Sequence, residues 1–207
     1  MRPRRALHRR GTVWLVAAAA AGCTSSPSAS VAEAPPPLLV GDSIGFASRA
    51  AFTAQGWAVD ADPGRSAYAG GFGRPAVSGW DAVSRAAATP ARIWIVQIGT
   101  NDLAAYDPDR FGTFVADVVA HTKVGCLVWV VPWQREQSEA GNVAAMSRQI
   151  RDGIAVHRRA DVHRWDEVAA ADPSLVPDGV HPGRGRGEDV FVVGVIETVA
   201  RTCDVGT

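Results

Sequence analysis

The sequence predicts an α/β fold: one domain built on a doubly wound parallel sheet with helices on both faces. Short apolar segments alternate along the chain with segments of helical periodicity. Two of these segments, 93–98 and 126–131, are apolar almost throughout, as a strand buried on both faces requires. With 207 residues, of which 47% are hydrophobic, the chain has room for one domain of ordinary size and can pack a core.

Five strands are expected, and the second and fifth have the weakest patterns. They are placed at 38–40, 57–59, 93–98, 126–131 and 162–165. Helical patterns lie near 45–54, 76–88, 108–121, 140–157 and 187–201. Five strands in a small domain suit the order 2-1-3-4-5 of a flavodoxin-like sheet. In such sheets ligands bind at the carboxyl ends of the strands, where the order reverses between strands 1 and 3.

The first 37 residues differ in composition from the rest. Residues 1–22 contain five arginines, no acidic residue and a short apolar run. That run is shorter than the roughly 18 residues that span a bilayer. A basic head, an apolar centre and small residues at its end are typical of a secretory signal peptide. Residues 23–37 are rich in Ser, Ala and Pro, which predicts a tether, and the folded domain is expected to span 38–207.

The charge left after removal of such a signal argues against one class of partner. Without the five arginines, 16 basic residues face 21 acidic ones, a net charge of about −5. A mildly acidic domain lacks the basic footprint of a nucleic-acid-binding protein. We expect a monomer with no nucleic-acid partner.

The end of the apolar run suggests where the protein is found. Ala20-Ala21-Gly22-Cys23 resembles the bacterial lipoprotein processing site, although Ala20 stands where such sites usually have Leu. The resemblance implies that Cys23 is lipidated and that the exported protein is attached to the outer face of the cytoplasmic membrane. The alternative is ordinary cleavage after an Ala-x-Ala sequence, with Cys23 lost or left free.

Three short motifs follow predicted strands. Gly-Asp-Ser at 41–43 ends the first strand, Gly-Thr-Asn-Asp at 99–102 ends the third, and Asp-Gly-Val-His at 178–181 follows the fifth. The carboxyl ends of parallel strands meet at one edge of the sheet. We therefore expect the three motifs to lie close together.

The residue types in these motifs suit nucleophilic catalysis. A serine hydroxyl such as that of Ser43 needs a base to take its proton, His181 can be that base, and Asp178 can hold the imidazole in the right tautomer. Each residue alone also fits an ordinary structural role: Ser43 as a helix cap, Asn101 and Asp102 as turn formers. Their joint order and spacing favour catalysis.

In these motifs, over about residues 38–201, the chain resembles the SGNH (GDSL) hydrolase superfamily. The resemblance implies an exported serine ester hydrolase, a short-chain acyl or O-acetyl esterase, that acts through an acyl-serine intermediate and needs no cofactor. Ser43 would be its nucleophile, and Asp178 and His181 would complete the triad. The expected substrate is a small acyl ester or an acylated glycan.

The resemblance also implies an oxyanion hole. Its donors would be the N–H of Ser43, the side-chain amide of Asn101 and the N–H of a glycine on the loop after the second strand. Gly64 is the best match for that glycine, and Gly70 is the second choice. Asp42 and Asp102 are expected to hold loops rather than to react.

Other assignments of the same residues are possible. Residues 41–45 also fit the Gly-x-Ser-x-Gly elbow of α/β-hydrolases, but that elbow normally follows several strands and only one precedes Ser43. The triad could equally serve an O-acyltransferase acting on a glycan. A non-catalytic lipoprotein could use the cleft for binding, although it would be expected to lack a nucleophile, a base or an oxyanion donor.

The remaining features have weaker functional patterns. Cys126 and Cys203 are predicted to form a disulfide, with two buried thiols as the alternative. Trp133 and Gln134 could form a substrate wall, or Trp133 could simply pack on the surface. Residues 70–73 could shape the mouth of the cleft, and 184–186 could bind an anion, but a plain loop and a solvated helix start fit these segments as well. His121, His157 and His163 show no metal-ligand spacing, so no metal is expected.

Overall fold

The structure of the protein is a computed structural model that describes residues 35–73, 75–86, 91–122, 125–136 and 140–203. The predicted signal peptide at 1–22, Cys23 and most of the tether at 23–37 lie outside the described residues, so these assignments remain predictions. Within the described ranges, no helix has both the length and the apolar character needed to cross a membrane.

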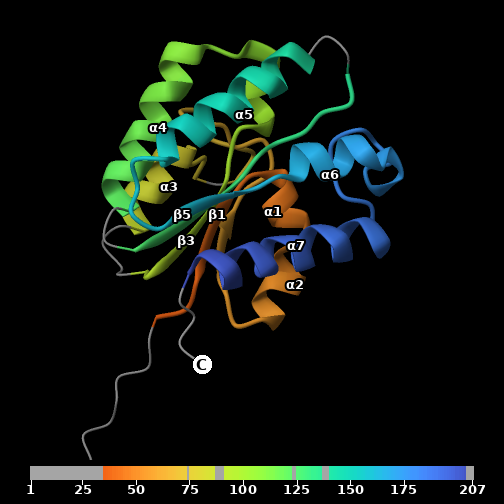
Figure 1. Ribbon diagram of the computed structural model, residues 1–207, viewed down its shortest axis with the longest axis horizontal. Coiled ribbons are helices and arrows are strands. Elements are labelled where there is room, and N and C mark those ends of the chain that lie inside the picture. The colour runs from red at the N-terminus through yellow and green to blue at the C-terminus, as the bar shows by residue number, and fades with distance from the viewer. Residues whose placement is uncertain (1–34, 74, 87–90, 123–124, 137–139, 204–207) are drawn as a thin grey trace, which may run out of the picture. The chain divides into compact units, whose positions relative to one another are not determined.

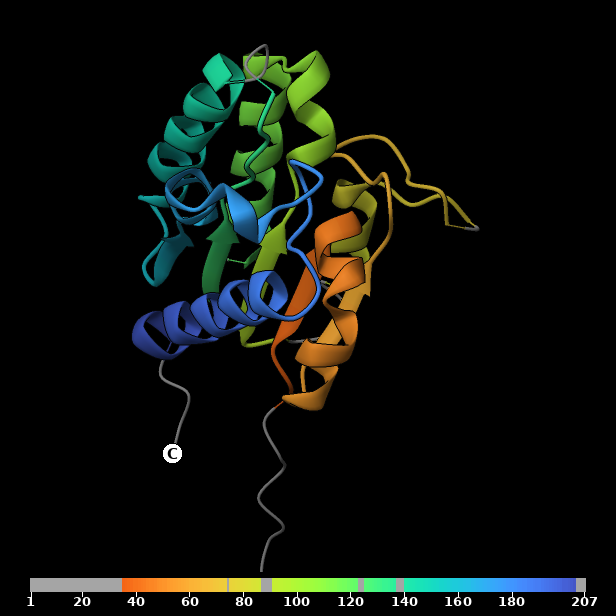
Figure 2. The ribbon, with the colours of Figure 1, turned by 90° about the vertical axis from the view of Figure 1, so that its right-hand side faces the viewer.

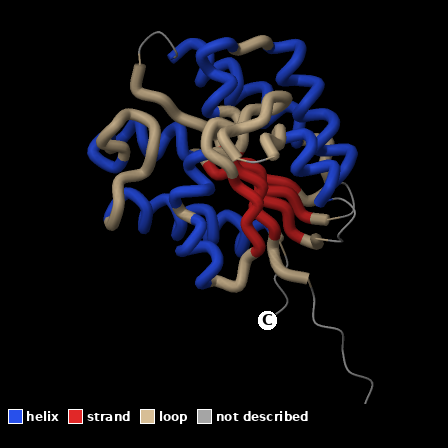
Figure 3. Tube along the Cα trace, turned by 180° about the vertical axis from the view of Figure 1, so that it is seen from behind, coloured by secondary structure: helices blue, strands red, loops and turns tan. Residues whose placement is uncertain are grey.

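A five-stranded parallel sheet forms the centre of the domain, as Figure 3 shows in red. Its order is β2-β1-β3-β4-β5, which confirms the predicted doubly wound topology. The strands are β1 (Leu38–Gly41), β2 (Ala58–Ala61), β3 (Ile93–Gln97), β4 (Cys126–Val130) and β5 (Ala160–His163).

Helices cover both faces of this sheet (Figures 1 and 2). One face carries α3 (Gly79–Ala86), α4 (Pro108–Thr122) and α5 (Ala140–Ile154). The other carries α1 (Ser43–Ala47), α2 (Arg49–Ala54), α6 (Trp165–Ala171) and α7 (Arg186–Thr202). Two 3-10 helices, η1 (Thr100–Ala105) and η3 (Pro173–Leu175), lie in the loops after β3 and α6.

The strands divide their side chains between two hydrophobic cores. In β4, Leu127 and Trp129 pack under α4 and α5, whereas Val128 and Val130 pack under α6 and α7. Every residue of β4 is buried. This is why the strand is apolar throughout rather than alternating with polar residues.

The structure corrects three predicted elements. β2 starts at Ala58, because Trp57 precedes the strand: its N–H donates to the Phe52 carbonyl at 3.2 Å, and its ring stacks on Phe52 with ring centroids 5.1 Å apart. β5 ends at His163, and Trp165, predicted to end that strand, begins α6. The first predicted helix, 45–54, is two short helices that meet at Ser48.

A disulfide joins Cys126 to Cys203, the pairing predicted from the sequence, with an S–S distance of 1.99 Å. Cys126 is the first residue of β4, and Cys203 caps the C-terminus of α7. The bond therefore ties the last helix to the amino edge of the sheet.

Candidate active site

Ser43 lies in a turn whose shape is set by buried side chains. The Asp42 carboxylate caps α1 by accepting the N–H of Ile44 at 3.0 Å. The side-chain oxygen of Gln97, at the end of β3, accepts the N–H of Gly45 at 2.8 Å. A Cβ on Gly41 would come within 2.9 Å of the Leu39 side chain and 3.1 Å of the Gln97 side-chain oxygen, so the residue before Asp42 is tightly packed. These contacts place the Ser43 side chain at the carboxyl edge of the sheet.

His181 and Asp178 reach Ser43 from the segment between η3 and α7. The Asp178 carboxylate accepts the N–H of Val180 at 2.9 Å and the N–H of His181 at 2.7 Å, which closes a tight turn. Its second oxygen lies 2.8 Å from His181 Nδ1. The other ring nitrogen, Nε2, lies 2.8 Å from Ser43 Oγ.

This geometry fixes the roles that each atom can take. With Nδ1–H donating to Asp178, Nε2 can accept the proton of the Ser43 hydroxyl. Partial burial acts to raise the pKa of Asp178, but the hydrogen bonds from the N–H groups and the ring of His181 outweigh it and lower that pKa below its ordinary value of 3.8. Asp178 is thus held as a carboxylate beside the imidazole.

The triad is open to solvent. The side chain of His181 is 38% exposed and that of Asp178 is 56% exposed. Solvent therefore reaches the side chains of both residues.

Two of the three predicted oxyanion donors lie on neighbouring loops. The Asn101 side-chain N–H₂ donates to the carbonyl of Arg65 at 2.9 Å and retains a second N–H. Gly64, next to Arg65 in sequence, has a φ of +78°, a conformation that glycine adopts without strain. In the part of the chain that the structure describes, no hydrogen bond uses the N–H of Ser43 or of Gly64. All three donors are free to bind an oxyanion.

Gly70, the second choice, is in a different environment. A Cβ on it would lie 2.7 Å from the backbone of Ala76. Gly70 is packed against its own loop, whereas Gly64 is next to Arg65, whose carbonyl accepts from Asn101, which favours Gly64 as the donor.

Sequence reasoning missed the residue that braces this region, Arg65. Its guanidinium, only 2% exposed, donates to the carbonyls of Gly41 at 3.2 Å, Asp60 at 2.8 Å and, through Nε, Val77 at 3.1 Å. It also pairs with the Asp60 carboxylate at 2.8 Å. Arg65 ties the end of β1 to the end of β2 and to the loop that holds Gly64. No local pattern separates such an arginine from a surface one.

Asp42 and Asp102 hold loops, as the sequence suggested. Asp42 is fully buried, and desolvation raises its pKa to about 6 despite the hydrogen bond from Ile44. Asp102 accepts the N–H of Ala67 at 3.1 Å, and burial together with the nearby Asp42 raises its pKa to about 6 as well. Two partly coupled carboxyls thus lie beneath the site.

Several further candidates take part in packing or ion pairing. Trp133 is 8% exposed and packs in the core with the side chains under α6 and α7, while Gln134 lies beside it in a small surface cleft. Arg186 pairs with Asp172 at 2.7 Å on the surface. Among the described ranges, no group of three His, Cys, Asp or Glu side chains could hold a metal ion.

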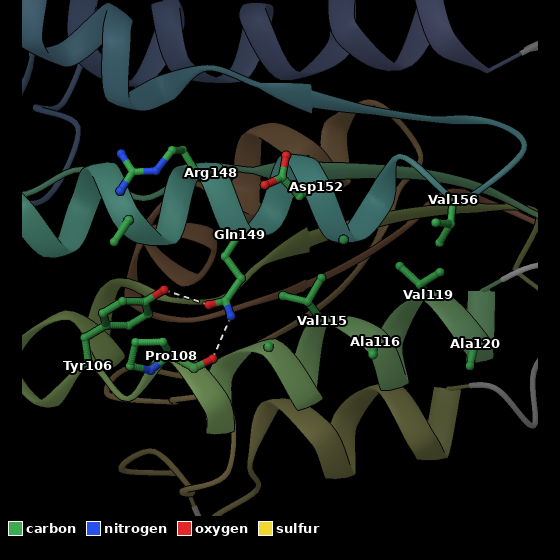
Figure 4. Close-up of a pocket in the computed structure, with 13 residues that line it drawn as sticks. Tyr106, Pro108, Val115, Ala116, Val119, Ala120, Arg148, Gln149, Asp152 and Val156 are labelled. Atoms are coloured by element: carbon green, nitrogen blue, oxygen red, sulfur yellow. Dashed lines mark hydrogen bonds between the residues drawn. The ribbon is translucent and has the colours of Figure 1, made fainter.

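A sizeable groove lies away from the triad. It has a volume of about 610 Å³ and lies between α4 and α5, lined by Val115, Ala116 and Arg148 among others (Figure 4). Gln149 crosses it, accepting from the Tyr106 hydroxyl at 2.6 Å and donating to the Pro108 carbonyl at 2.6 Å. The residues that line this groove include no serine, cysteine or histidine.

Comparisons with known proteins identify the fold. Neither a family model nor a curated protein matches the sequence. Among solved structures, a member of the lipolytic G-D-S-L family from Veillonella parvula has a TM-score of 0.65 and 16% identity, over 80% of this chain and 98% of that one. The catalytic domain of peptidoglycan O-acetyltransferase A from Streptococcus pneumoniae has a TM-score of 0.63 and 14% identity, over 82% of this chain and 94% of that one. A GDSL-like lipase from Bacteroides thetaiotaomicron has a TM-score of 0.62 and 14% identity, over 81% of this chain and 88% of that one. The chain therefore has the fold of the SGNH (GDSL) hydrolases.

Proposed function

We propose that the protein is a serine ester hydrolase that acts through an acyl-Ser43 intermediate. One observation carries this proposal: an unbroken hydrogen-bonded chain runs from Ser43 Oγ through His181 to Asp178, with both contacts at 2.8 Å. The three residues come from segments 138 positions apart in sequence and meet at the sheet edge where ligands bind in such folds.

The first half-reaction forms the acyl-enzyme. Ser43 Oγ attacks the ester carbonyl carbon while His181 Nε2 takes its proton, giving a tetrahedral intermediate and an imidazolium that Asp178 stabilises. The N–H groups of Ser43 and Gly64 and the free N–H of Asn101 donate to the oxyanion. The intermediate then collapses: the bond to the alcohol oxygen breaks, and His181 returns the proton to the departing alcohol.

The second half-reaction releases the acid. Water attacks the carbonyl of acyl-Ser43 as His181 takes a proton from it, and the bond to Ser43 Oγ breaks as that oxygen regains a proton. The exposure of His181 favours water as the acceptor, because solvent reaches the side chain of the base. The likeness to an O-acetyltransferase domain supports the alternative, in which a glycan hydroxyl takes the place of water.

The proposed substrate is a small acyl ester, including an acylated glycan, met outside the cytoplasm. The basic and apolar segment at 1–22 and Cys23 support export and a lipid anchor. The disulfide between Cys126 and Cys203 is consistent with an oxidising compartment. Growth of the producing cell on a labelled fatty acid would test the anchor, because the label should appear on the wild type and be lost from a Cys23→Ser variant.

Hydrolysis of p-nitrophenyl acetate and its longer-chain homologues by the full chain tests the chemistry. Ser43→Ala should lower kcat by about 10⁴-fold or more, since it removes the nucleophile. Ser84→Ala is the matched control, because this hydroxyl on α3 has no hydrogen-bond partner among the described residues. If the folded wild type and Ser43→Ala showed equal rates on every ester, hydrolysis would be excluded, and transfer to an acceptor or ligand binding would replace it.

A further inference from the structure

An exposed aromatic ring lies next to the proposed oxyanion hole. Phe72 is 85% exposed, more than any other large apolar side chain that the structure describes. It belongs to the segment between β2 and α3, which projects from the body of the domain in Figure 2. A single exposed apolar side chain is ordinary on a protein surface. This one differs because its backbone is held in place.

Hydrogen bonds close the Phe72 segment onto the loop that carries Gly64. The N–H of Phe72 donates to the carbonyl of Pro63 at 2.8 Å, and the N–H of Gly73 donates to the Asp62 carboxylate at 3.0 Å. The approach is close enough to require glycine on both sides of Phe72. A Cβ on Gly71 would lie 2.4 Å from the Pro63 carbonyl oxygen, and one on Gly73 would lie 2.4 Å from the Asp62 carboxylate.

The ring itself covers Gly64. A Cβ on Gly64 would lie 2.8 Å from Phe72 Cε2 and 3.1 Å from Cδ2, so the edge of the ring rests against the Gly64 backbone. Gly64 is the residue whose N–H we place in the oxyanion hole. Phe72 therefore offers an apolar surface beside the position of the reacting carbonyl.

The positions of the other groups decide which part of a substrate meets this ring. In the tetrahedral intermediate, the former carbonyl carbon is bonded to Ser43 Oγ, to the oxyanion, to the leaving-group oxygen and to the acyl chain. The oxyanion faces Gly64 and Asn101, and the leaving oxygen must face His181 Nε2 to receive its proton. The His181 segment contacts the loop after β4, where the N–H of Arg135 donates to the Gly179 carbonyl at 2.9 Å. Phe72 comes from the loop after β2, on the other side of β1 in the sheet. The acyl chain is the remaining substituent, and the apolar surface beside Gly64 on that side of the sheet is the Phe72 ring.

We propose that Phe72 is a specificity-determining residue, whose ring forms the wall of the acyl site and gives the enzyme a preference for aliphatic acyl chains of four to six carbons over acetyl. This inference rests on the proposed esterase function. Each methylene that leaves water against an apolar surface strengthens binding by up to about fourfold. One open ring face covers only part of each methylene, so the preference grows gradually with chain length.

The test compares p-nitrophenyl acetate, butanoate and hexanoate as substrates of the full chain and of Phe72→Ala. We expect Phe72→Ala to lower kcat/KM for the hexanoate by about tenfold and for the acetate by less than about twofold. Phe72→Leu should keep most of the preference, because it restores an aliphatic wall. Val193→Ala is the matched control, since Val193 is an exposed apolar side chain on α7, 51% exposed, and comes from another part of the fold.

Several results would each overturn the inference. An equal loss on all three esters would show that Phe72 only supports the Gly64 loop. Unchanged selectivity, or the same shift in Val193→Ala, would show that the ring does not contact the acyl group. Unchanged selectivity with lost binding to phosphatidylglycerol vesicles would make Phe72 a membrane contact. Failure of the esterase proposal itself is distinguished by Ser43→Ala, which would then leave the rates on all three esters unchanged.

Discussion

Removing the disulfide between Cys126 and Cys203 should destabilise the domain strongly while leaving its chemistry intact. The two cysteines are 77 positions apart in sequence. In the chain-entropy model, opening a loop of this length returns roughly 15 cal/mol/K to the unfolded chain, or about 4.5 kcal/mol at 25 °C. Both side chains are buried, so replacing them with alanine adds a small cost from lost packing.

The active site should not respond to this change at 25 °C. The disulfide lies at the C-terminal end of α7, whereas His181 precedes its N-terminal end. The 17 residues of α7 separate the two ends by about 25 Å. We expect kcat on a p-nitrophenyl ester to change by less than about twofold, and the temperature of half inactivation to fall by about 10 °C or more.

Urea unfolding followed by circular dichroism measures the loss. The wild type, the wild type with reductant, and Cys126→Ala/Cys203→Ala should be compared. The reduced wild type and the double alanine variant should have similar free energies of unfolding, both about 4 kcal/mol below that of the oxidised wild type. A difference under about 1 kcal/mol would refute the reasoning. So would three free thiols in the denatured, non-reduced chain, since Cys23 accounts for at most one.

Two further predictions concern the polar groups around Ser43. Asn101→Ala should lower kcat by about 10²–10³-fold with little change in KM or in the urea midpoint, because the exposed amide contributes one oxyanion donor; an unchanged kcat would remove Asn101 from the hole. Asp42→Asn should unfold with a different pH dependence. The folded pKa of Asp42, about 6, lies above the ordinary 3.8, so its contribution to stability is present below pH 4 and is lost as the pH rises through 6. This loss is about 3 kcal/mol for the wild type. Between pH 4 and pH 7, the free energy of unfolding of the variant, measured in urea, should therefore rise relative to that of the wild type. Parallel curves of this free energy against pH would contradict the raised pKa of Asp42.

Much of the fold could be predicted because its central strands are buried on both faces. β3 and β4 are five-residue runs, apolar almost throughout and too short for a typical buried helix. The ends of β1 and β3 place Ser43 and Asn101 at the edge where the order of the sheet reverses. Asp178 and His181 could be found because a three-residue spacing in a loop lets the two side chains meet. These inferences use patterns local to a few residues.

The errors arose where tertiary contacts override local pattern. Trp165 has the propensity of a strand residue, yet it starts α6, where its ring packs on Phe191 with centroids 5.1 Å apart. Trp57 lies outside β2, because its N–H and its ring both contact Phe52 at the end of α2. Arg65 was missed because its partners, the carbonyls of Gly41, Asp60 and Val77, come together only in the folded chain.

The buried polar residues explain how an open site can still be rigid. His181 and Asp178 are partly exposed and would be mobile if nothing fixed the backbone around them. Beneath Ser43, however, Asp42, Gln97 and Arg65 are buried and hold the ends of β1, β2 and β3 together. Preorganised donors need such support to act without reorganisation during the reaction. This support costs stability, because the Asp42 carboxylate, which caps the helix that begins with Ser43, is kept out of water. The raised pKa of Asp42 reflects that cost. Loss of stability with rising pH is thus a consequence of the same contacts that position Ser43.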